Sequence, residues 1–309
     1  MKNILICGSI AYDSIMVFQD QFKNHILPDQ IHNLNICFYV PEMKKNFGGT
    51  AGNIAYNLKL LRSNPLIMAT HGDDFELYSN WLDSLGISKK YMKKITGMFT
   101  AQAFITTDQD DNQITAFHPG AMIQAHTNSI ANVEDSIDLA IIAPDGRDAM
   151  IQHAQQCYKA NIPFIFDPGQ GLPMFTAEEL ITFIEQASYI AVNDYEAKLL
   201  QDKTGLTVEK ITSKVKAFIV TKGAHGSEIY TDNEMIKIDA IKASNLVDPT
   251  GCGDAFRSGL IYGISAGWDW HKTGKLASVM GAIKIGFEGG QNHQPTIHDI
   301  EALFGQVLG

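Results

Sequence analysis

The chain has 309 residues, of which 45% are hydrophobic and 19% charged. This composition supports one large folded domain with a substantial core and argues against disorder. The 34 acidic residues outnumber the 24 basic ones, for a net charge of −10, and this argues against partners such as nucleic acid or an anionic membrane, because both require a basic surface. The four cysteines form no CxxC pair, and no stretch approaches the roughly 20 apolar residues that span a bilayer. We therefore expect a cytoplasmic protein.

Short β-branched runs alternate with amphipathic stretches along the chain. Core strands are expected at 3–9, 65–72, 138–144, 162–168, 189–194 and 217–223. Helices are expected at 74–86, 147–158, 176–187, 252–267, 271–287 and 296–308. Thr176 and Glu179 fit a capping box at the start of one of them. This alternation predicts an α/β fold with a doubly wound, mostly parallel sheet and helices on both faces. Ligands of such sheets bind at the carboxyl ends of the strands.

Two regions, about 12–46 and 98–121, interrupt the alternation. The first contains the strand-like pieces SIMVF (14–18) and LNICFYV (34–40). The second contains TAQAFITTD and QITAFHPGA, which are separated by the turn QDDN and predict a hairpin. We expect the two inserts to form a small β-sheet that acts as a lid over the strand ends. No linker-like or repeated segment is found in the sequence, so residues 1–309 are interpreted as a single domain.

The segment DPTGCGDAF, residues 248–256, places a bend immediately before an apolar helix. The first turn of such a helix has free N–H groups and the positive end of the helix dipole, which together form an anion hole. Asp254 would repel a bound phosphate, but it suits a base that takes a proton from an attacking hydroxyl. An ordinary helix cap explains this stretch equally well. The usual phosphate loop and dinucleotide fingerprints are absent from the sequence.

Five segments, taken together and in order, resemble the PfkB (ribokinase-like) kinases over essentially the whole chain. They are FGGTAGNIAYNL (47–58), GDDFELYSNWLDSLGI (72–87), NDYEAKLL (193–200), VTKGAHG (220–226) and DPTGCGDAFRSGL (248–260). The resemblance implies a ribokinase-like fold with a β-lid. It also implies transfer of the γ-phosphate of ATP to a hydroxymethyl group.

By this resemblance, Asp254 is the catalytic base, and the backbone of Gly251, Cys252 and Gly253 forms the anion hole. The family usually has alanine at position 252. Because cysteine is small and the backbone N–H does not depend on the side chain, we interpret Cys252 as structural and not as a nucleophile.

The resemblance also implies a nucleotide site. Asn193 and Glu196 match an N-x-x-E motif that helps to place Mg²⁺ through water, although Glu196 alone would be interpreted as an exposed helix acid. The segment that contains Thr221, Gly223 and Gly226 matches a loop beside ATP, although glycines between strands also form ordinary turns.

Two further residues match cation positions of the family. Asp248 and Thr250 resemble positions at which many members hold a monovalent cation such as K⁺. Those contacts are made largely by the backbone.

The acceptor is expected near the start of the helix that follows FGGTAGN. Gly48 and Gly49 allow a sugar to lie against the backbone, and the Asn53 amide can donate to and accept from hydroxyls. An ordinary capped helix is the alternative. By the resemblance, Asp13 accepts hydrogen bonds from two vicinal hydroxyls, which suits the cis-diol of ribose.

Within the family, the lid hairpin, FDPGQGLP, NDYE and DPTGCGDAFRSG resemble bacterial adenosine kinases more than sugar kinases. In that subgroup aromatic rings of the lid stack on the purine, and Phe117 matches such a position. Ala103 stands where a second aromatic residue is expected, and strand alternation places Phe104 on the opposite face. Gln170 is interpreted either as a contact to the base or as an exposed turn residue.

The leading hypothesis is an ATP- and Mg²⁺-dependent kinase for the 5′-hydroxyl of a ribonucleoside, with adenosine as first candidate. The alternatives are a sugar kinase of the same family and, more remotely, a non-catalytic binding protein. A phosphorylated acceptor would require basic residues near the lid, and the candidates are more typical of a solvated rim: Lys44, Lys45, Lys93 and Lys94. The sequence leaves open whether the protein is a monomer or a homodimer.

Overall fold

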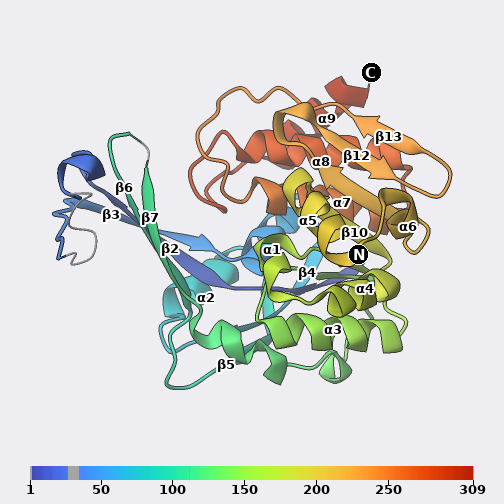
Figure 1. Ribbon diagram of the computed structural model, residues 1–309, viewed down its shortest axis with the longest axis horizontal. Helices are drawn as coiled ribbons and strands as arrows, with labels where there is room; N and C mark the ends of the chain where they lie inside the picture. The colour runs from blue at the N-terminus through green and yellow to red at the C-terminus, as the bar shows by residue number, and fades with distance from the viewer. Residues whose placement is uncertain (1, 27–34, 111, 309) are drawn as a thin grey trace.

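The structure is a computed structural model that describes residues 2–26, 35–110 and 112–308. Its larger sheet has nine strands in the order β13-β12-β11-β10-β9-β8-β1-β4-β5 (Figure 1). The run from β11 to β5 is parallel, and β12 and β13 extend it in antiparallel fashion. The strands are β1 (Asn3–Cys7), β4 (Asn64–His71), β5 (Ser88–Lys94), β8 (Leu139–Ile142), β9 (Phe164–Phe166), β10 (Tyr189–Asn193), β11 (Ala217–Thr221), β12 (Ser227–Tyr230) and β13 (Met235–Ile238).

Helices cover both faces of this sheet, which confirms the predicted doubly wound architecture. On β1, Ile4 and Ile6 point into one core with α1, α2 and α7, whereas Leu5 and Cys7 point into a second core with α3, α4 and α5. The helices are α1 (Thr50–Leu60), α2 (Glu76–Ser84), α3 (Arg147–Lys159), α4 (Ala177–Gln186), α5 (Asp194–Thr204), α6 (Val208–Thr212), α7 (Cys252–Ala266), α8 (Trp270–Lys284) and α9 (Ile297–Leu308). Short 3₁₀ segments are η1 (Phe22–Asn24), η3 (Gly120–Thr127), η4 (Ile130–Asn132), η5 (Gly169–Met174) and η6 (Gly223–His225).

All six predicted core strands and the six predicted helices are present, with ends that shift by a few residues. The capping box of Thr176 and Glu179 is confirmed as well. Three strands of the large sheet were not predicted. β5, with the sequence SKKYMKK, is a lysine-rich edge strand, and β12 and β13 have only four residues each, so none carries a long apolar run.

A second sheet of four strands, in the order β3-β2-β6-β7, projects from the larger unit on the left of Figure 1. Its strands are β2 (Ala11–Val17), β3 (Glu42–Gly48), β6 (Ala101–Thr107) and β7 (Gln113–His118). The predicted hairpin is confirmed, because β6 and β7 pair in antiparallel fashion.

The strand predicted at 34–40 is wrong for residues 35–40, which are irregular, and position 34 lies outside the described residues. The pairing strand is β3, a few residues further on. The apolar character of the predicted segment serves a different purpose, because the Phe38 ring packs against Phe18 and Phe22.

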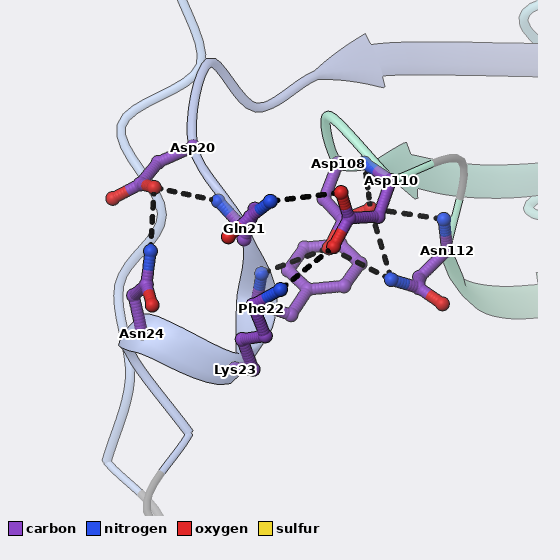
Figure 2. A network of polar contacts seen from close by, with 8 residues as sticks. All are labelled: Asp20, Gln21, Phe22, Lys23, Asn24, Asp108, Asp110 and Asn112. Carbon is purple, nitrogen blue, oxygen red and sulfur yellow. Dashed lines mark hydrogen bonds and ion pairs between the residues drawn. The ribbon is translucent and has the colours of Figure 1, made fainter.

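Polar contacts join the two inserts at the outer end of the second sheet (Figure 2). The buried Asp108, which follows β6, accepts hydrogen bonds from the backbone of Phe22 and Asn112 at 2.9 Å each. The Gln21 amide donates to Asp110 at 2.8 Å. These bonds make the β6–β7 turn and the segment after β2 one connected unit. None of the helices in the described part of the chain is long and apolar enough to cross a membrane.

Candidate active site

The anion hole is predicted at the first turn of α7. The N-cap, Gly251, has φ 76° and ψ 2°, a left-handed conformation that favours glycine, and no side chain caps the helix. In the described residues, the N–H groups of Gly253 and Asp254 have no hydrogen-bond partner, and a Cβ on Gly253 would meet no atom within 4 Å. The Cys252 N–H, in contrast, donates to the Pro249 carbonyl at 3.1 Å. Whether the backbone of Gly251, Cys252 and Gly253 binds an anion stays a prediction.

Asp254 is the third residue of α7, and its side chain does not cap the helix. Its Oδ2 accepts a hydrogen bond from Asn53 Nδ2 at 2.8 Å. Burial raises the pKa of Asp254 to about 7, and the charge of Asp167 adds to this effect, while the Asn53 bond and the Arg257 charge oppose it. A carboxyl group that titrates near neutrality suits a general base.

A guanidinium lies one helical turn further on, but Asp254 is not bonded to it. Arg257 Nε donates to Asp167 Oδ2 at 3.1 Å, and Arg257 Nη2 donates to the Ala191 carbonyl at 3.2 Å. Both partners of this ion pair are buried. Because Arg257 is neutralised by Asp167, the carboxylate of Asp254 keeps one oxygen free of protein hydrogen bonds within the described chain.

The second sheet brings two of the predicted acceptor residues, Asp13 and Phe117, to one face. Asp13 on β2 is in register with Ala103 on β6, and Ala103 is in register with Phe117 on β7. Residues in register share a face of a sheet, so Asp13 and Phe117 face the same side. Phe117 is 53% exposed. Phe104, one residue along from Ala103, faces the other side as expected.

The Asp13 carboxyl has no hydrogen-bond partner in the described part of the chain. Burial, together with the nearby charge of Asp248, raises the pKa of Asp13 to about 6. A Cβ on Gly48 would lie 2.4 Å from Asp13 Oδ2, so the glycine leaves room for this carboxyl group. Asp13 and Asp254 both raise the pKa of Tyr78, although burial of that hydroxyl is the larger cause. Both carboxyl groups therefore flank the same small region.

The other predicted acceptor residues differ in their surroundings. Gly49 is the N-cap of α1 with φ 84°, which fits the capped-helix alternative. Both polar atoms of the Asn53 amide are engaged with protein, since Nδ2 donates to Asp254 and Oδ1 accepts from Gln291 at 3.1 Å. A contact between Asn53 and an acceptor hydroxyl stays a prediction. Gln170 is exposed on η5.

The predicted nucleotide residues lie where β10 and β11 end. Asn193 and Glu196 form a capping box on α5, with backbone-to-side-chain bonds of 2.7 and 2.8 Å. Glu196 is half-buried, which raises its pKa, so it is not the exposed helix acid of the alternative interpretation. Thr221 ends β11.

The two glycines after Thr221 have clear conformational roles. Gly223 and Gly226 have φ of 54° and 85°, so both occupy the left-handed region that favours glycine. A Cβ on Gly226 would also lie 2.0 Å from the Ile238 carbonyl oxygen. The turn between β11 and β12 therefore requires them, whatever binds beside it.

In the described residues, no group of three or more His, Cys, Asp or Glu side chains could hold a metal ion. The protein side chains therefore provide no complete ligand set for Mg²⁺. This donor set fits an ion held mainly by phosphate oxygens and water, with one carboxylate such as Glu196 nearby, which is the usual coordination of Mg²⁺ beside nucleotides.

The donor set at Asp248 does not fit a free K⁺ ion. The Asp248 carboxylate accepts from the N–H groups of Thr250 at 2.9 Å and Gly289 at 2.7 Å. Its carbonyl oxygen accepts from the ammonium of Lys284 at 2.8 Å, and this ammonium also donates to the Phe287 carbonyl at 2.8 Å. Lys284 is fully buried, and burial lowers its pKa. Sequence reasoning missed this lysine, although a single cation inside the apolar run VMGAIKIGF was a signal.

Comparisons with known proteins agree with this geometry. A model of the pfkB family carbohydrate kinases matches residues 10–297. The chain therefore belongs to the pfkB family of carbohydrate kinases, as the five sequence segments predicted.

Within the family, the similar proteins include nucleoside kinases. One from Methanocaldococcus jannaschii is 31% identical over 298 residues, which cover 96% of this chain and 94% of that protein. The structure of Burkholderia thailandensis nucleoside kinase in complex with inosine has 50% identity and a TM-score of 0.89, covering 99% of this chain and 98% of that one. A complex of the same enzyme with ADP and inosine gives 52% identity and a TM-score of 0.87, covering 99% and 96%.

Proposed function

We propose that this protein is an ATP-dependent kinase that phosphorylates the 5′-hydroxyl of a ribonucleoside. The observation that carries the proposal is the first turn of α7. There, among the residues that the structure describes, two N–H groups without a hydrogen-bond partner stand beside a carboxyl group that has a pKa of about 7 and no cationic partner. The similarity to nucleoside kinases, one of them solved with ADP and inosine, supports this choice among the activities of the family.

In this proposal the acceptor lies between the two sheets. Asp13 accepts hydrogen bonds from the vicinal ribose hydroxyls, and the exposed ring of Phe117, on the same face, stacks on the base. Asp254 removes the proton from the 5′-hydroxyl as it attacks the γ-phosphorus. The N–H groups of Gly253 and Asp254 stabilise the charge on the phosphoryl oxygens. Most of the rate enhancement then comes from positioning and charge stabilisation.

We further propose that ATP lies along the ends of β10 and β11, beside Asn193, Thr221 and the η6 turn. Mg²⁺, when bound to the nucleotide, neutralises phosphate charge during transfer. Glu196 would orient water on this ion. The second sheet, formed from the two inserts, would act as a lid that excludes water from the acceptor. The four cysteines are all unpaired, which agrees with a reducing compartment such as the cytoplasm.

Adenosine is the first candidate acceptor because the sequence resembles adenosine kinases, and inosine is a second because the Burkholderia enzyme was solved with it. A sugar kinase is the remaining alternative. An ADP-release assay with adenosine, inosine, guanosine, cytidine, ribose and fructose separates these possibilities. The proposal expects turnover with at least one nucleoside, at a kcat/KM well above that with either free sugar. Turnover with free sugars alone would refute it.

A further inference from the structure

A chain of hydrogen bonds between amide and indole groups lies directly behind Asp254. The Trp81 indole on α2 donates to Gln291 Oε1 at 2.9 Å. Gln291 Nε2 donates to Asn53 Oδ1 at 3.1 Å, and Asn53 Nδ2 donates to Asp254 Oδ2 at 2.8 Å. Three separate regions of the sequence are therefore linked, through Asn53, to the carboxyl group assigned as base.

The Trp81 indole fixes the donor-to-acceptor direction of these hydrogen bonds. An indole N–H can only donate, so the carbonyl end of the Gln291 amide has to face Trp81. The NH₂ end of Gln291 then faces Asn53, which in turn presents its own carbonyl to Gln291. The NH₂ end of Asn53 is left facing Asp254. An amide that was free to rotate could also turn its oxygen toward Asp254 and accept a hydrogen bond from the protonated acid, whereas the ionised carboxylate accepts only from the NH₂ group.

A branch of the same network leads to the acceptor side. The second N–H of Gln291 donates to Tyr78 Oη at 2.6 Å, and the Tyr78 hydroxyl donates to the Gly48 carbonyl at 2.7 Å. Gln291 and Tyr78 are 1% and 0% exposed. Both hydrogens of the Gln291 amide are used, and a buried polar network that is fully satisfied holds its members rigidly.

Two glycines make room for the network. A Cβ on Gly52 would lie 1.9 Å from Tyr78 Oη, and a Cβ on Gly290 would lie 2.3 Å from Asn53 Oδ1. Neither glycine has a positive φ, so the backbone conformation alone does not require glycine at either position. The side chains of the network occupy the space that a Cβ would need, and this explains why both positions are glycine.

We propose that Trp81 and Gln291 are positioning residues that orient the Asn53 amide so that its N–H group always faces the ionised Asp254 carboxylate. Trp81 and Gln291 act through Asn53 and are not among the residues predicted to contact the substrate. This inference rests on the proposed function only for the role of Asp254 as base.

The hydrogen bonds that run from Trp81 through Gln291 and Asn53 to Asp254 form a relay. This relay opposes the increase that burial causes in the pKa of Asp254. Without the Asn53 donor, the pKa of Asp254 would rise from about 7 to above neutrality, and less of the enzyme would hold the ionised base at a given pH. The other groups that face Asp254 are Asp13 on β2, Asp167 after β9 and Arg257 on α7. The Tyr78 hydroxyl and the Cys252 thiol are also close enough to respond to its charge. Trp81→Phe leaves all of these charges unchanged, whereas a carboxylate at position 291 adds a negative charge that itself raises the pKa of Asp254.

The decisive variant is Trp81→Phe, because it removes the N–H group and keeps a ring that can stack on Phe47, 5.5 Å away between centroids. Trp268→Phe is the matched control, since Trp268 stacks on Phe304 and follows the C-terminal end of α7, whereas Asp254 lies in its first turn. We expect Trp81→Phe to move the acid limb of the pH profile of kcat/KM upward by about one unit. This shift corresponds to about a tenfold loss at pH 6 and nearly normal activity at pH 9. The control should keep the wild-type profile.

A second variant tests the direction of the relay. Gln291→Glu preserves the shape of the side chain but places an acceptor where Asn53 requires a donor. We expect the Asn53 amide to turn its NH₂ end toward the new carboxylate, so Asp254 loses its donor and the acid limb moves further than in Trp81→Phe. Thermal unfolding of each variant confirms that it is folded.

An unchanged pH limb in both variants, or an equal loss at all pH values, would overturn the relay, since a merely structural role predicts one of these results. Titration of the ¹³C-labelled Asp254 carboxyl by NMR measures the same pKa without turnover, with Asp254→Asn to assign the signal. If the wild-type protein phosphorylates no nucleoside, the proposed function fails, and the NMR titration still decides whether Trp81 and Gln291 control the pKa of Asp254.

Discussion

The substitution Asp254→Asn should affect catalysis and stability in opposite directions. Asparagine has nearly the same shape and can still accept the hydrogen bond from Asn53, but it cannot take a proton. General-base catalysis contributes about 10²–10⁴-fold, so kcat should fall by that factor while ATP binding survives. An ADP-release assay measures the loss, and titration with a fluorescent ATP analogue measures binding. Turnover within about threefold of wild type would refute the assignment of Asp254 as base.

The stability effect follows from the raised pKa. In the unfolded chain the carboxyl has its ordinary pKa of 3.8, and in the native protein the pKa is about 7. The native state therefore binds the proton more tightly, and the wild type loses stability as the pH rises from about 4 to about 7. Three pKa units at 1.36 kcal/mol each give a ceiling of about 4 kcal/mol. Because the side chain is partly open to solvent, we expect on the order of 1–3 kcal/mol.

Asp254→Asn removes this destabilisation, so at pH 8 the variant should melt about 1.5–5 °C above the wild type. Below about pH 4 the carboxyl is protonated in both states and the difference should vanish. Thermal unfolding at pH 4 and pH 8 tests both statements. A variant that is less stable than the wild type at pH 8 would contradict the view that burial raises the pKa of Asp254.

Three further substitutions test other parts of the site. Phe117→Ala should raise KM for the nucleoside at least about tenfold and leave KM for ATP nearly unchanged; equal increases would make Phe117 a packing residue. Gly48→Ala places a Cβ 2.4 Å from Asp13 Oδ2, so KM for the acceptor should rise while the protein still unfolds cooperatively. An unchanged KM would argue against Asp13 as an acceptor ligand. Because the Lys284 ammonium already occupies the Asp248 carbonyl, wild-type turnover should be the same in Na⁺ and K⁺ buffers. Lys284→Met should lower both activity and melting temperature, and a wild type that requires K⁺ would show that a free ion is needed after all.

Local patterns were sufficient for most of the fold because buried parallel strands carry unbroken apolar runs. β1, β4 and β8 were predicted in this way. β5 was missed because an edge strand can be rich in lysine. The strand that is β3 was predicted several residues too early, because the apolar residues near Phe38 pack as a cluster of rings and not as a strand. In both cases the contacts that decide the structure come from elsewhere in the chain.

The sequence by itself determined the family, the alternation of strands and helices, and the position of Asp254 at the start of a helix, since all of these are encoded in short segments. Only the tertiary structure decided what surrounds that carboxyl group. Asn53 and Gln291 are separated by 238 residues and nevertheless share a hydrogen bond. Likewise, the Lys284 ammonium reaches the Asp248 carbonyl only because α8 packs against α7. The pKa of a buried carboxyl depends on the donors and charges that folding brings to it, and residue spacing does not reveal these.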